Sequence, residues 1–437
     1  MHYKNIRKST GWIYNILVPF VHLEYLMLFR KLFIYNKKGI PSDKPVLIAA
    51  NHPTAFIDPL FFCFSFDPPV YNMTRGDIFR KPFYRYLMEQ CNMFPVYRQR
   101  DGYESRDRND GVFEYCEKKM LNGVAVNIFV EGEHHLDKRV LRLQKGIARI
   151  AFGTYEKHHL KELQIIPVGC NYATGDLARD EAKVNVGEPI FVKDYWEAYQ
   201  ANPNGAILQL CTDIRDNLLE LCYHIEDPED DGLADNLLEL WRNDHPAKVL
   251  PIEERTNGRF LQEKALLNGL NAMQAEPKKN LRSRTSAYFE TLSKSGISDE
   301  VLMRSGQGSW LWFLFLVIGF VPFLVGHILS WPFITLASNI ARSKVKKREF
   351  RTSVLMGVTF VGSIILYMLL IPVAIFISWK FVLIFVLLYP FLCGFSVVWS
   401  ERLRLWKGAR KALKHPARAN LLQLRKAVQY ESTLGIA

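Results

Sequence analysis

The sequence predicts an α/β fold: a mostly parallel sheet flanked by helices, with membrane helices towards the C-terminus. Helical patterns separate the predicted strands, so the connections are crossovers of the kind that parallel strands require. The long uncharged stretches that predict membrane helices lie after Gly308. Four short apolar runs bounded by turn or polar residues predict buried strands; they are Pro45–Ala50, Asn92–Tyr97, Val124–Val130 and Ile165–Gly169.

Length and charge limit the classes of protein that the chain can form. At 437 residues we expect one to three folding units. A net charge of +12 with 29 Phe, 19 Tyr and 9 Trp favours a membrane surface or a phosphorylated partner, and the apolar C-terminal part argues against nucleic acid. The odd number of cysteines and the lack of a C-x-x-C pair indicate a reducing compartment and no zinc site of cysteine type. The seven are Cys63, Cys91, Cys116, Cys170, Cys211, Cys222 and Cys393.

Near the N-terminus, Trp12–Tyr35 is rich in aromatic residues, is interrupted by Pro19 and Glu24, and is flanked by Lys and Arg. This pattern predicts one or two helices that lie in the membrane interface, with a buried core helix as the alternative. Basic residues precede the stretch as in a signal peptide, but Glu24 and the lack of a small-residue cleavage site favour a retained segment.

Three stretches are long enough to cross roughly 30 Å of hydrocarbon: Trp310–Ala341, Ser353–Trp379 and Phe381–Ser400. The loop Arg342–Arg351 holds six Lys or Arg against one Glu, and the tail after Glu401 is basic, so both should face the cytoplasm. The second and third stretches then form a hairpin. We expect the first to be a re-entrant hairpin bent near its Pro and Gly residues, with a single tilted span as the alternative; those residues are Pro322, Gly326 and Pro332.

These patterns divide the chain into five predicted parts. They are membrane-interface helices at 1–38, the α/β domain at 39–200, a helical appendage at 201–308, transmembrane hairpins at 309–400 and a basic cytoplasmic tail at 401–437. Within the appendage, the acidic run Glu226–Asp231 and the basic patch Lys278–Arg284 are interpreted as solvated faces.

The candidate catalytic pair follows the strand Pro45–Ala50, where the sequence continues as Asn51, His52 and, six positions after the histidine, Asp58. Six steps of 100° leave the two side chains on different faces of a helix, so they can meet only across a turn. Asp58 would then hold one imidazole nitrogen so that the other stays an unprotonated base. The alternative is a helix cap with a structural histidine.

This segment resembles the catalytic block of the glycerophosphate and lysophosphatidate acyltransferases of phospholipid synthesis, whose signature is Asn-His-x-x-x-x-Asp. Here five residues separate His52 from Asp58, which is similar to the branch that includes the fungal glycerol-3-phosphate/dihydroxyacetone-phosphate acyltransferases. Further blocks follow in the family's order: Asn92–Arg98, Phe129–Gly132 with Leu143–Gly146, and Ile166–Gly169. The third block departs from the family's pattern, because Val130 stands where proline is usual.

The resemblance implies roles for the residues in these blocks. Arg98 is expected to bind the phosphate of the acceptor through its planar fork, with further positive charge from Lys138, Arg139 and Lys145. Glu131 is expected to hydrogen-bond the hydroxyls of the acceptor, and Gly132 to let the backbone approach the substrate closely.

A metal site at His134, His135 and Asp137 is the alternative for the third block. We reject it, because adjacent side chains on an extended segment point in opposite directions and no third, spaced histidine supports it. No cofactor is expected besides the acyl donor, which is acyl-CoA or acyl-carrier protein.

The sequence therefore predicts an integral membrane O-acyltransferase with its active site at the cytoplasmic face. It would move a fatty acyl group from an acyl thioester to the hydroxyl of glycerol 3-phosphate or lysophosphatidate, with His52 as general base. Its expected partners are the phospholipid bilayer, the thioester donor and a phosphorylated glycerol or lysolipid acceptor. The alternatives are a remodelling acyltransferase for lysophospholipids or lyso-aminolipids, and a non-catalytic lipid-binding protein on the same fold.

Overall fold

The computed structural model describes residues 11–66, 69–96, 105–304, 310–376 and 378–436. The chain forms two compact units, and both are discontinuous in sequence. The first contains Met1–Tyr223, Leu250–Gly258 and Lys347–Ser353. The second contains His224–Val249, Arg259–Lys346 and Val354–Ala437.

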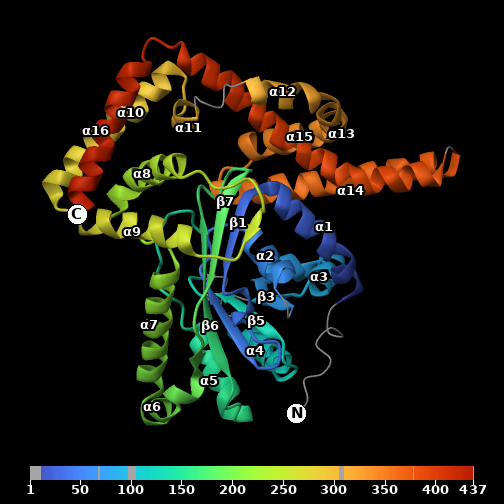
Figure 1. Ribbon diagram of the computed structural model, residues 1–437. Helices are drawn as coiled ribbons and strands as arrows, with labels where there is room; N and C mark the ends of the chain where they lie inside the picture. Colours follow the sequence, from blue (N-terminus) through green and yellow to red (C-terminus); the bar gives the residue numbers. More distant parts are fainter. Residues whose placement is uncertain (1–10, 67–68, 97–104, 305–309, 377, 437) are drawn as a thin grey trace. The chain divides into compact units, whose positions relative to one another are not determined.

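The first unit is built on a mixed, mostly parallel sheet, drawn in Figure 1. The strands are β1 (Phe29–Tyr35), β2 (Val46–Ala50), β3 (Val70–Arg75), β4 (Met93–Val96), β5 (Ala125–Phe129), β6 (Gln164–Tyr172), β7 (Asp180–Val186), β8 (Ile190–Phe191) and β9 (Glu253–Glu254). Their order across the sheet is β4-β3-β5-β2-β6-β7-β1-β9, and β8 pairs with β6. Only the pairings of β6 with β7 and with β8 are antiparallel within the described residues. The fold class predicted from the sequence is confirmed.

Helices cover both faces of this sheet. One face packs through the alternate residues Leu47, Ala49, Val126 and Ile128 against α4, α5 and α7. On the other side, α2 contacts α1 and β3, and α1 also contacts α3. Figure 1 shows α7 and α2 on opposite sides of the strands. The helices of this unit are α1 (Trp12–Leu28), α2 (Ile57–Ser65), α3 (Pro82–Gln90), α4 (Ser105–Leu121), α5 (Gly146–His158), α6 (Trp196–Ala201) and α7 (Pro203–Leu221).

The four apolar runs are strands, as predicted, but the prediction of helix throughout Trp12–Tyr35 was wrong for its last 7 residues. Helix α1 ends at Leu28, and Phe29–Tyr35 is strand β1, which pairs in parallel with β7. Strand β1 contains a lysine, Lys31, which is fully buried and forms an ion pair with Glu254 of β9. Aromatic and branched residues suit a strand as well as an interfacial helix, so tertiary pairing decides the structure here.

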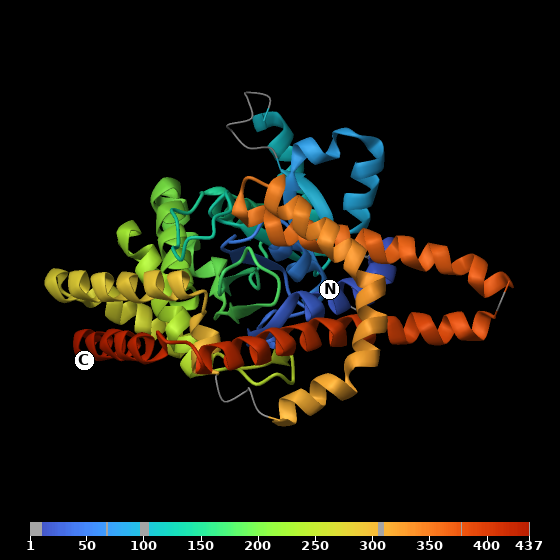
Figure 2. The same cartoon turned by 90° about the horizontal axis from the view of Figure 1, so that it is seen from above.

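The second unit is helical in its described residues. Its helices are α8 (Asp231–Asp244), α9 (Gly258–Ala272), α10 (Ala275–Ser295), α11 (Asp299–Met303), α12 (Trp310–Ile318), α13 (Phe320–Ser343), α14 (Arg351–Phe376), α15 (Trp379–Leu413) and α16 (Arg418–Ile436). The first residues of α9 and α14 belong to the first unit. Figure 2 shows α10 and α16 side by side, in agreement with their extensive contact.

Three helices are long and apolar enough to cross a membrane: Phe320–Ser343, Arg348–Phe376 and Trp379–Leu413. The first apolar stretch breaks close to only one of the residues near which a bend was predicted: Pro322 lies in the first turn of α13, whereas Gly326 and Pro332 lie well inside that helix. The break is at Gly319, between α12 and α13. Gly326 has a different use: a Cβ atom there would come within 2.2 Å of the carbonyl oxygen of Leu392, so glycine lets α13 pack closely on α15.

The interpretation of the two charge runs as solvated faces fits most of their residues, which are exposed, but not Asp230. The carboxylate of Asp230, from the acidic run, is buried and accepts hydrogen bonds from Lys278 and Arg282 of the basic patch, each at 2.8 Å. Opposite charges that are far apart in sequence satisfy one another when the helices pack, which a single-segment pattern cannot indicate.

A second buried charge network joins the C-terminal helix α16 to α11. Arg425 donates from Nε to Asp299 Oδ1 at 2.7 Å and from Nη1 to Asp244 Oδ1 at 2.9 Å. Tyr288 and Asn243 also donate to Asp299, whose side chain is fully buried. The basic tail is therefore held by specific ion pairs within the second unit.

We expect Asp299→Ala to lower the free energy of unfolding by about 3 kcal/mol, because it leaves the guanidinium of Arg425 buried with one of its two acidic partners removed. The measurement is chemical denaturation of the detergent-solubilised protein. The matched control is Glu290→Ala, which removes an exposed ion pair with Lys294 and should unfold as the wild type does. Equal unfolding midpoints for the two variants would contradict the prediction.

Candidate active site

The site begins where β2 ends, and Asn51 fixes the chain at that point. Its side-chain amide donates to the carbonyl oxygen of Cys170 at 2.9 Å, and its side-chain oxygen accepts from the N–H of Cys170 at 2.7 Å. Cys170 lies on β6, the neighbouring strand. The two bonds continue the strand pairing through a side chain, so the next residue, His52, leaves the sheet in a fixed direction.

The structure brings His52 and Asp58 together across the turn that precedes α2. His52 Nδ1 lies 2.9 Å from Asp58 Oδ2. Asp58 is in the first turn of α2 and is fully buried. Its other contacts are with the N–H of Thr54 (2.8 Å), the hydroxyl of Thr54 (2.8 Å) and the hydroxyl of Tyr172 (2.6 Å). Four partners therefore hold the carboxylate in one orientation.

This arrangement selects the tautomer of His52. Because the carboxylate of Asp58 accepts at Nδ1, a neutral imidazole would carry its proton on that nitrogen and leave the lone pair on Nε2. Burial, followed by the charge of Asp58, raises the pKa of Tyr172 well above its ordinary value, so Tyr172 remains a neutral donor. The imidazole of His52 stacks on Phe129 at 3.8 Å between ring centroids and keeps 12% of its side chain exposed. The imidazole of His52 is thus held in one orientation and remains accessible to solvent.

Glu131 ties three segments of the site together. One carboxylate oxygen accepts from the N–H of His52 at 3.2 Å and lies 3.3 Å from His135 Nε2, while the other accepts from the N–H of Leu141 at 2.9 Å. Its side chain is fully buried. Burial lowers the pKa of His135, but the hydrogen bond to Glu131 and its charge outweigh that effect, and the net shift is upward. In this structure Glu131 connects these loops by hydrogen bonds, and its predicted contact with acceptor hydroxyls stays a prediction.

The remaining predicted residues lie along the loop between β5 and α5. Gly132 has φ of +75°, a left-handed conformation that favours glycine. The ammonium of Lys138 donates to the carbonyl oxygen of Ala173 at 3.2 Å, and Arg139 follows it on the same loop. Lys145 is exposed just before α5 and lies on the side of Cys211. Burial raises the pKa of the Cys211 thiol, and the positive charge of Lys145 opposes part of that rise. Arg98 lies outside the described residues.

Two histidines of the loop point to different neighbours. The ring of His134 meets that of His52 edge to face, with centroids 5.6 Å apart, whereas His135 contacts Glu131. This divergence is what the extended backbone predicts for adjacent side chains.

Sequence reasoning missed a segment that completes this region, Lys347–Ser353, which follows α13 and includes the first residues of α14. Its backbone and side chains bond to the turn that separates His52 from Asp58, and the ring of Phe350 lies 4.9 Å from that of His134. The sequence signal was present as a cluster of basic residues, but it was interpreted only as an indicator of membrane orientation.

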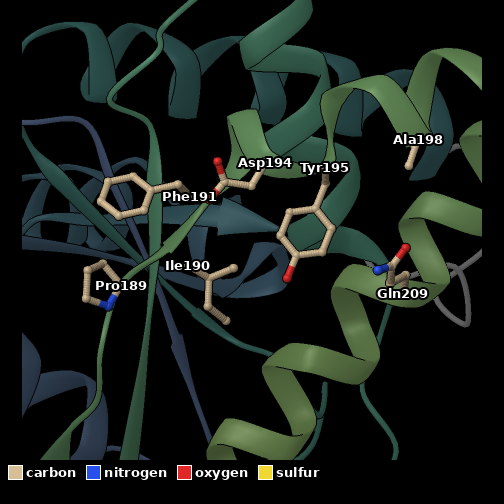
Figure 3. A pocket seen from close by; sticks show the side chains of 7 residues that line it. All are labelled: Pro189, Ile190, Phe191, Asp194, Tyr195, Ala198 and Gln209. Atoms are coloured by element: carbon tan, nitrogen blue, oxygen red, sulfur yellow. The ribbon is translucent and has the colours of Figure 1, made fainter.

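A separate hollow of about 450 Å³ opens beside β8. Figure 3 shows the ring of Tyr195 over it, between Ile190 and Gln209. Because Ile190 pairs with Ile165 near the amino end of β6, this hollow lies at the end of the sheet opposite to His52, which follows the carboxyl end of β2. We assign it no role in the site.

Comparison with known proteins places this region in a family. Residues 31–171 match the model of the Acyltransferase family. An uncharacterized acyltransferase of Schizosaccharomyces pombe is 26% identical over 191 residues, covering 43% of this chain and 27% of that protein. Glycerol-3-phosphate O-acyltransferase 1 of Saccharomyces cerevisiae is 25% identical over 255 residues, covering 56% of this chain and 32% of that protein. The matched parts thus span about a third or less of these two relatives.

Among solved structures, the 1-acyl-sn-glycerophosphate acyltransferase PlsC from Thermotoga maritima aligns with a TM-score of 0.33 and 17% identity, over 45% of this chain and 78% of that one. This likeness is too weak to support an inference about activity. The family match covers the strand end with Asn51 and His52, the turn to Asp58, the loop with Glu131 and most of β6. The chain therefore contains a domain of the Acyltransferase family at residues 31–171.

Proposed function

We propose that the protein is a membrane-bound O-acyltransferase that moves a fatty acyl group from an acyl thioester to the hydroxyl of glycerol 3-phosphate or lysophosphatidate. The observation that carries the proposal is the hydrogen bond between His52 and the buried Asp58 at the carboxyl end of β2, inside the residues that match the family. In open α/β sheets this end of the strands is where substrates bind. The apolar helices after Phe320 are consistent with a lipid substrate.

In the proposed reaction His52 acts as a general base. Its Nε2 takes the proton from the acceptor hydroxyl as the hydroxyl oxygen attacks the thioester carbonyl carbon. Asp58 stabilises the imidazolium that forms. The carbon–sulfur bond then breaks, and the imidazolium returns the proton to the departing thiolate, which leaves an ester and a free thiol. The reaction needs no cofactor other than the thioester donor.

Binding of a phosphorylated acceptor is proposed for the cations of the site. Arg98 would hold the phosphate through two parallel bonds, as the resemblance of its block implies. Lys138 and Arg139 lie on the loop after Glu131 and would add positive charge. Lys145 is the weaker candidate, because it lies on the side of α7. The backbone at Gly132 would approach the substrate, since no side chain shields it.

We expect His52→Ala to lower the rate of acyl transfer to glycerol 3-phosphate by about 10²-fold or more, because the general base is lost. The assay uses a purified membrane fraction, labelled acyl-CoA or acyl-carrier protein, and a panel of acceptors. The matched control is His159→Asn, at an exposed position with φ of +49° where asparagine is tolerated.

The possible outcomes of this activity assay distinguish between the candidate functions. Activity in His52→Ala equal to that of the wild type would eliminate His52 as the base. Transfer to a phosphate-free lysolipid that is unchanged by Arg98→Ala would favour the remodelling acyltransferase. Lipid binding without turnover on any donor and acceptor would favour a non-catalytic protein.

The hydroxyl of Tyr172 is expected to contribute to the rate through Asp58. We expect Tyr172→Phe to lower kcat about tenfold and to leave KM nearly unchanged, because a hydrogen bond to a charged group is lost while the acceptor site is untouched. Steady-state kinetics measure both parameters. A rise in KM with an unchanged kcat would contradict this role.

We also propose that the active site faces the cytoplasm. Lys347–Ser353 belongs to the same compact unit as the sheet, and so does the chain up to Tyr223. All three candidate spans begin at or after Phe320, so the stretch from Trp310 to Lys346 starts and ends on the side of the active site. This supports a re-entrant arrangement for α12 and α13, and the basic residues of the loop indicate the cytoplasmic side.

We expect a membrane-impermeant maleimide to label Lys346→Cys in sealed microsomes, and to label Lys380→Cys only after permeabilisation. Lys380 lies near the turn between α14 and α15, at the far end of that hairpin. The native cysteines are all buried, which keeps the background low. Protection of Lys346→Cys until permeabilisation would overturn the proposed orientation.

A further inference from the structure

The segment Lys347–Ser353, which we call the brace, joins two apolar helices yet belongs to the unit that contains the sheet. It consists of a short 3₁₀ turn, Arg348–Phe350, and the first residues of α14. A connection between membrane helices has no need of contacts with a catalytic domain. Its contacts with the site therefore call for a functional explanation.

The brace is anchored by a buried acid. Asp176, on the loop between β6 and β7, has only 5% of its side chain exposed, and its Oδ2 accepts from Arg348 Nε at 2.9 Å and from Arg351 Nη1 at 3.1 Å. The hydroxyl of Thr352 donates to the carbonyl oxygen of Gly175 at 3.0 Å. Both guanidinium groups bond to the same oxygen of this carboxylate. The side chain of Arg351 is 31% exposed and that of Arg348 is 62% exposed, so solvent screens the bond of Arg351 less.

From this anchor the brace reaches the turn between His52 and Asp58. The N–H of Ala55 donates to the carbonyl oxygen of Glu349 at 3.2 Å, and the N–H of Phe56 donates to the hydroxyl of Ser353 at 3.1 Å. Both donors lie just before α2, where backbone N–H groups have no helical partner. The brace supplies acceptors that the turn itself lacks.

The side chain of Phe350 extends the contact towards the base. Its ring meets that of His134 edge to face at 4.9 Å and that of Phe56 at 6.1 Å. The ring of His134 in turn meets that of His52 at 5.6 Å. The brace thus contacts the turn through two hydrogen bonds and the neighbouring aromatic rings through Phe350.

We propose that the brace is a positioning element of the active site, which holds the turn from His52 to Asp58 in the geometry needed for proton transfer. The proposal rests on the proposed function for its kinetic test. Catalysis depends on this because a small misplacement of a base relative to its substrate lowers the rate without changing substrate affinity. The brace residues act through the turn, and none is required to touch the reacting atoms.

The kinetic test compares two pairs of variants. Ser353→Ala removes the acceptor for Phe56 and should lower kcat about fivefold with KM unchanged, whereas Ser353→Thr keeps a hydroxyl and should restore the wild-type rate. The double variant Arg348→Ala/Arg351→Ala should lower kcat by about tenfold or more. Its matched control is Lys344→Ala/Lys346→Ala, which removes the same charge from exposed residues of the same basic stretch and should leave kcat unchanged.

A second measurement does not depend on turnover. Hydrogen exchange of the peptide that covers residues 53–57 should be faster in Ser353→Ala and in Arg348→Ala/Arg351→Ala than in the wild type and the lysine control. If the wild type transfers no acyl group to any acceptor, the proposed function fails while this measurement still tests the contact.

Four results would overturn the proposal. The first is exchange in the peptide 53–57 that does not change in either brace variant. The second is faster exchange with an unchanged kcat, which would make the brace a structural contact only. The third is a loss confined to KM, which would make it a substrate-binding element. The fourth is a fall in kcat in Lys344→Ala/Lys346→Ala that equals the fall in Arg348→Ala/Arg351→Ala, because the effect would then come from the lost net charge.

Discussion

The site depends on the burial of one carboxylate. Asp58 is fully removed from solvent, and a buried charge is tolerated only where hydrogen bonds compensate for the lost hydration. Thr54 supplies two of these bonds from the turn, Tyr172 supplies one from β6, and the last is the bond with His52. The geometry of the site thus follows from the hydrogen bonds that compensate for the burial of Asp58. Any change that weakens one donor loosens the orientation of the imidazole.

Sequence reasoning succeeded where the determinants are local. The strands β2, β4, β5 and β6 are short apolar runs, and their burial on both faces of the sheet makes them readable without partners. Strand β7 has the sequence DEAKVNV, and it looks like a polar loop. Its Lys183 is nevertheless fully buried and lies 3.3 Å from Glu181. The counter-charge is thus local, but the burial of this strand follows from its place between β6 and β1, and a linear pattern does not contain that information.

The same distinction applies to the site. The pair of His52 and Asp58 could be predicted because one turn contains both residues. The donor Tyr172 is 114 positions from Asp58, and Arg348 is 172 positions from Asp176. Their roles follow from the order of the strands and from the return of a late segment to the sheet. The family resemblance supplied the residues within the blocks, but the brace lies outside the part of the chain that the resemblance covers.

The discontinuity of the first unit has a consequence for biosynthesis. Residues 1–223 leave the ribosome long before Lys347–Ser353, and the apolar helices α12 and α13 are made in between. Until that late segment arrives, Asp176 has neither guanidinium partner, and the N–H groups of Ala55 and Phe56 lack their acceptors. Completion of the first unit therefore follows the synthesis of the apolar helices α12 and α13 of the second unit, so the order of synthesis differs from the order in which the two units can be completed.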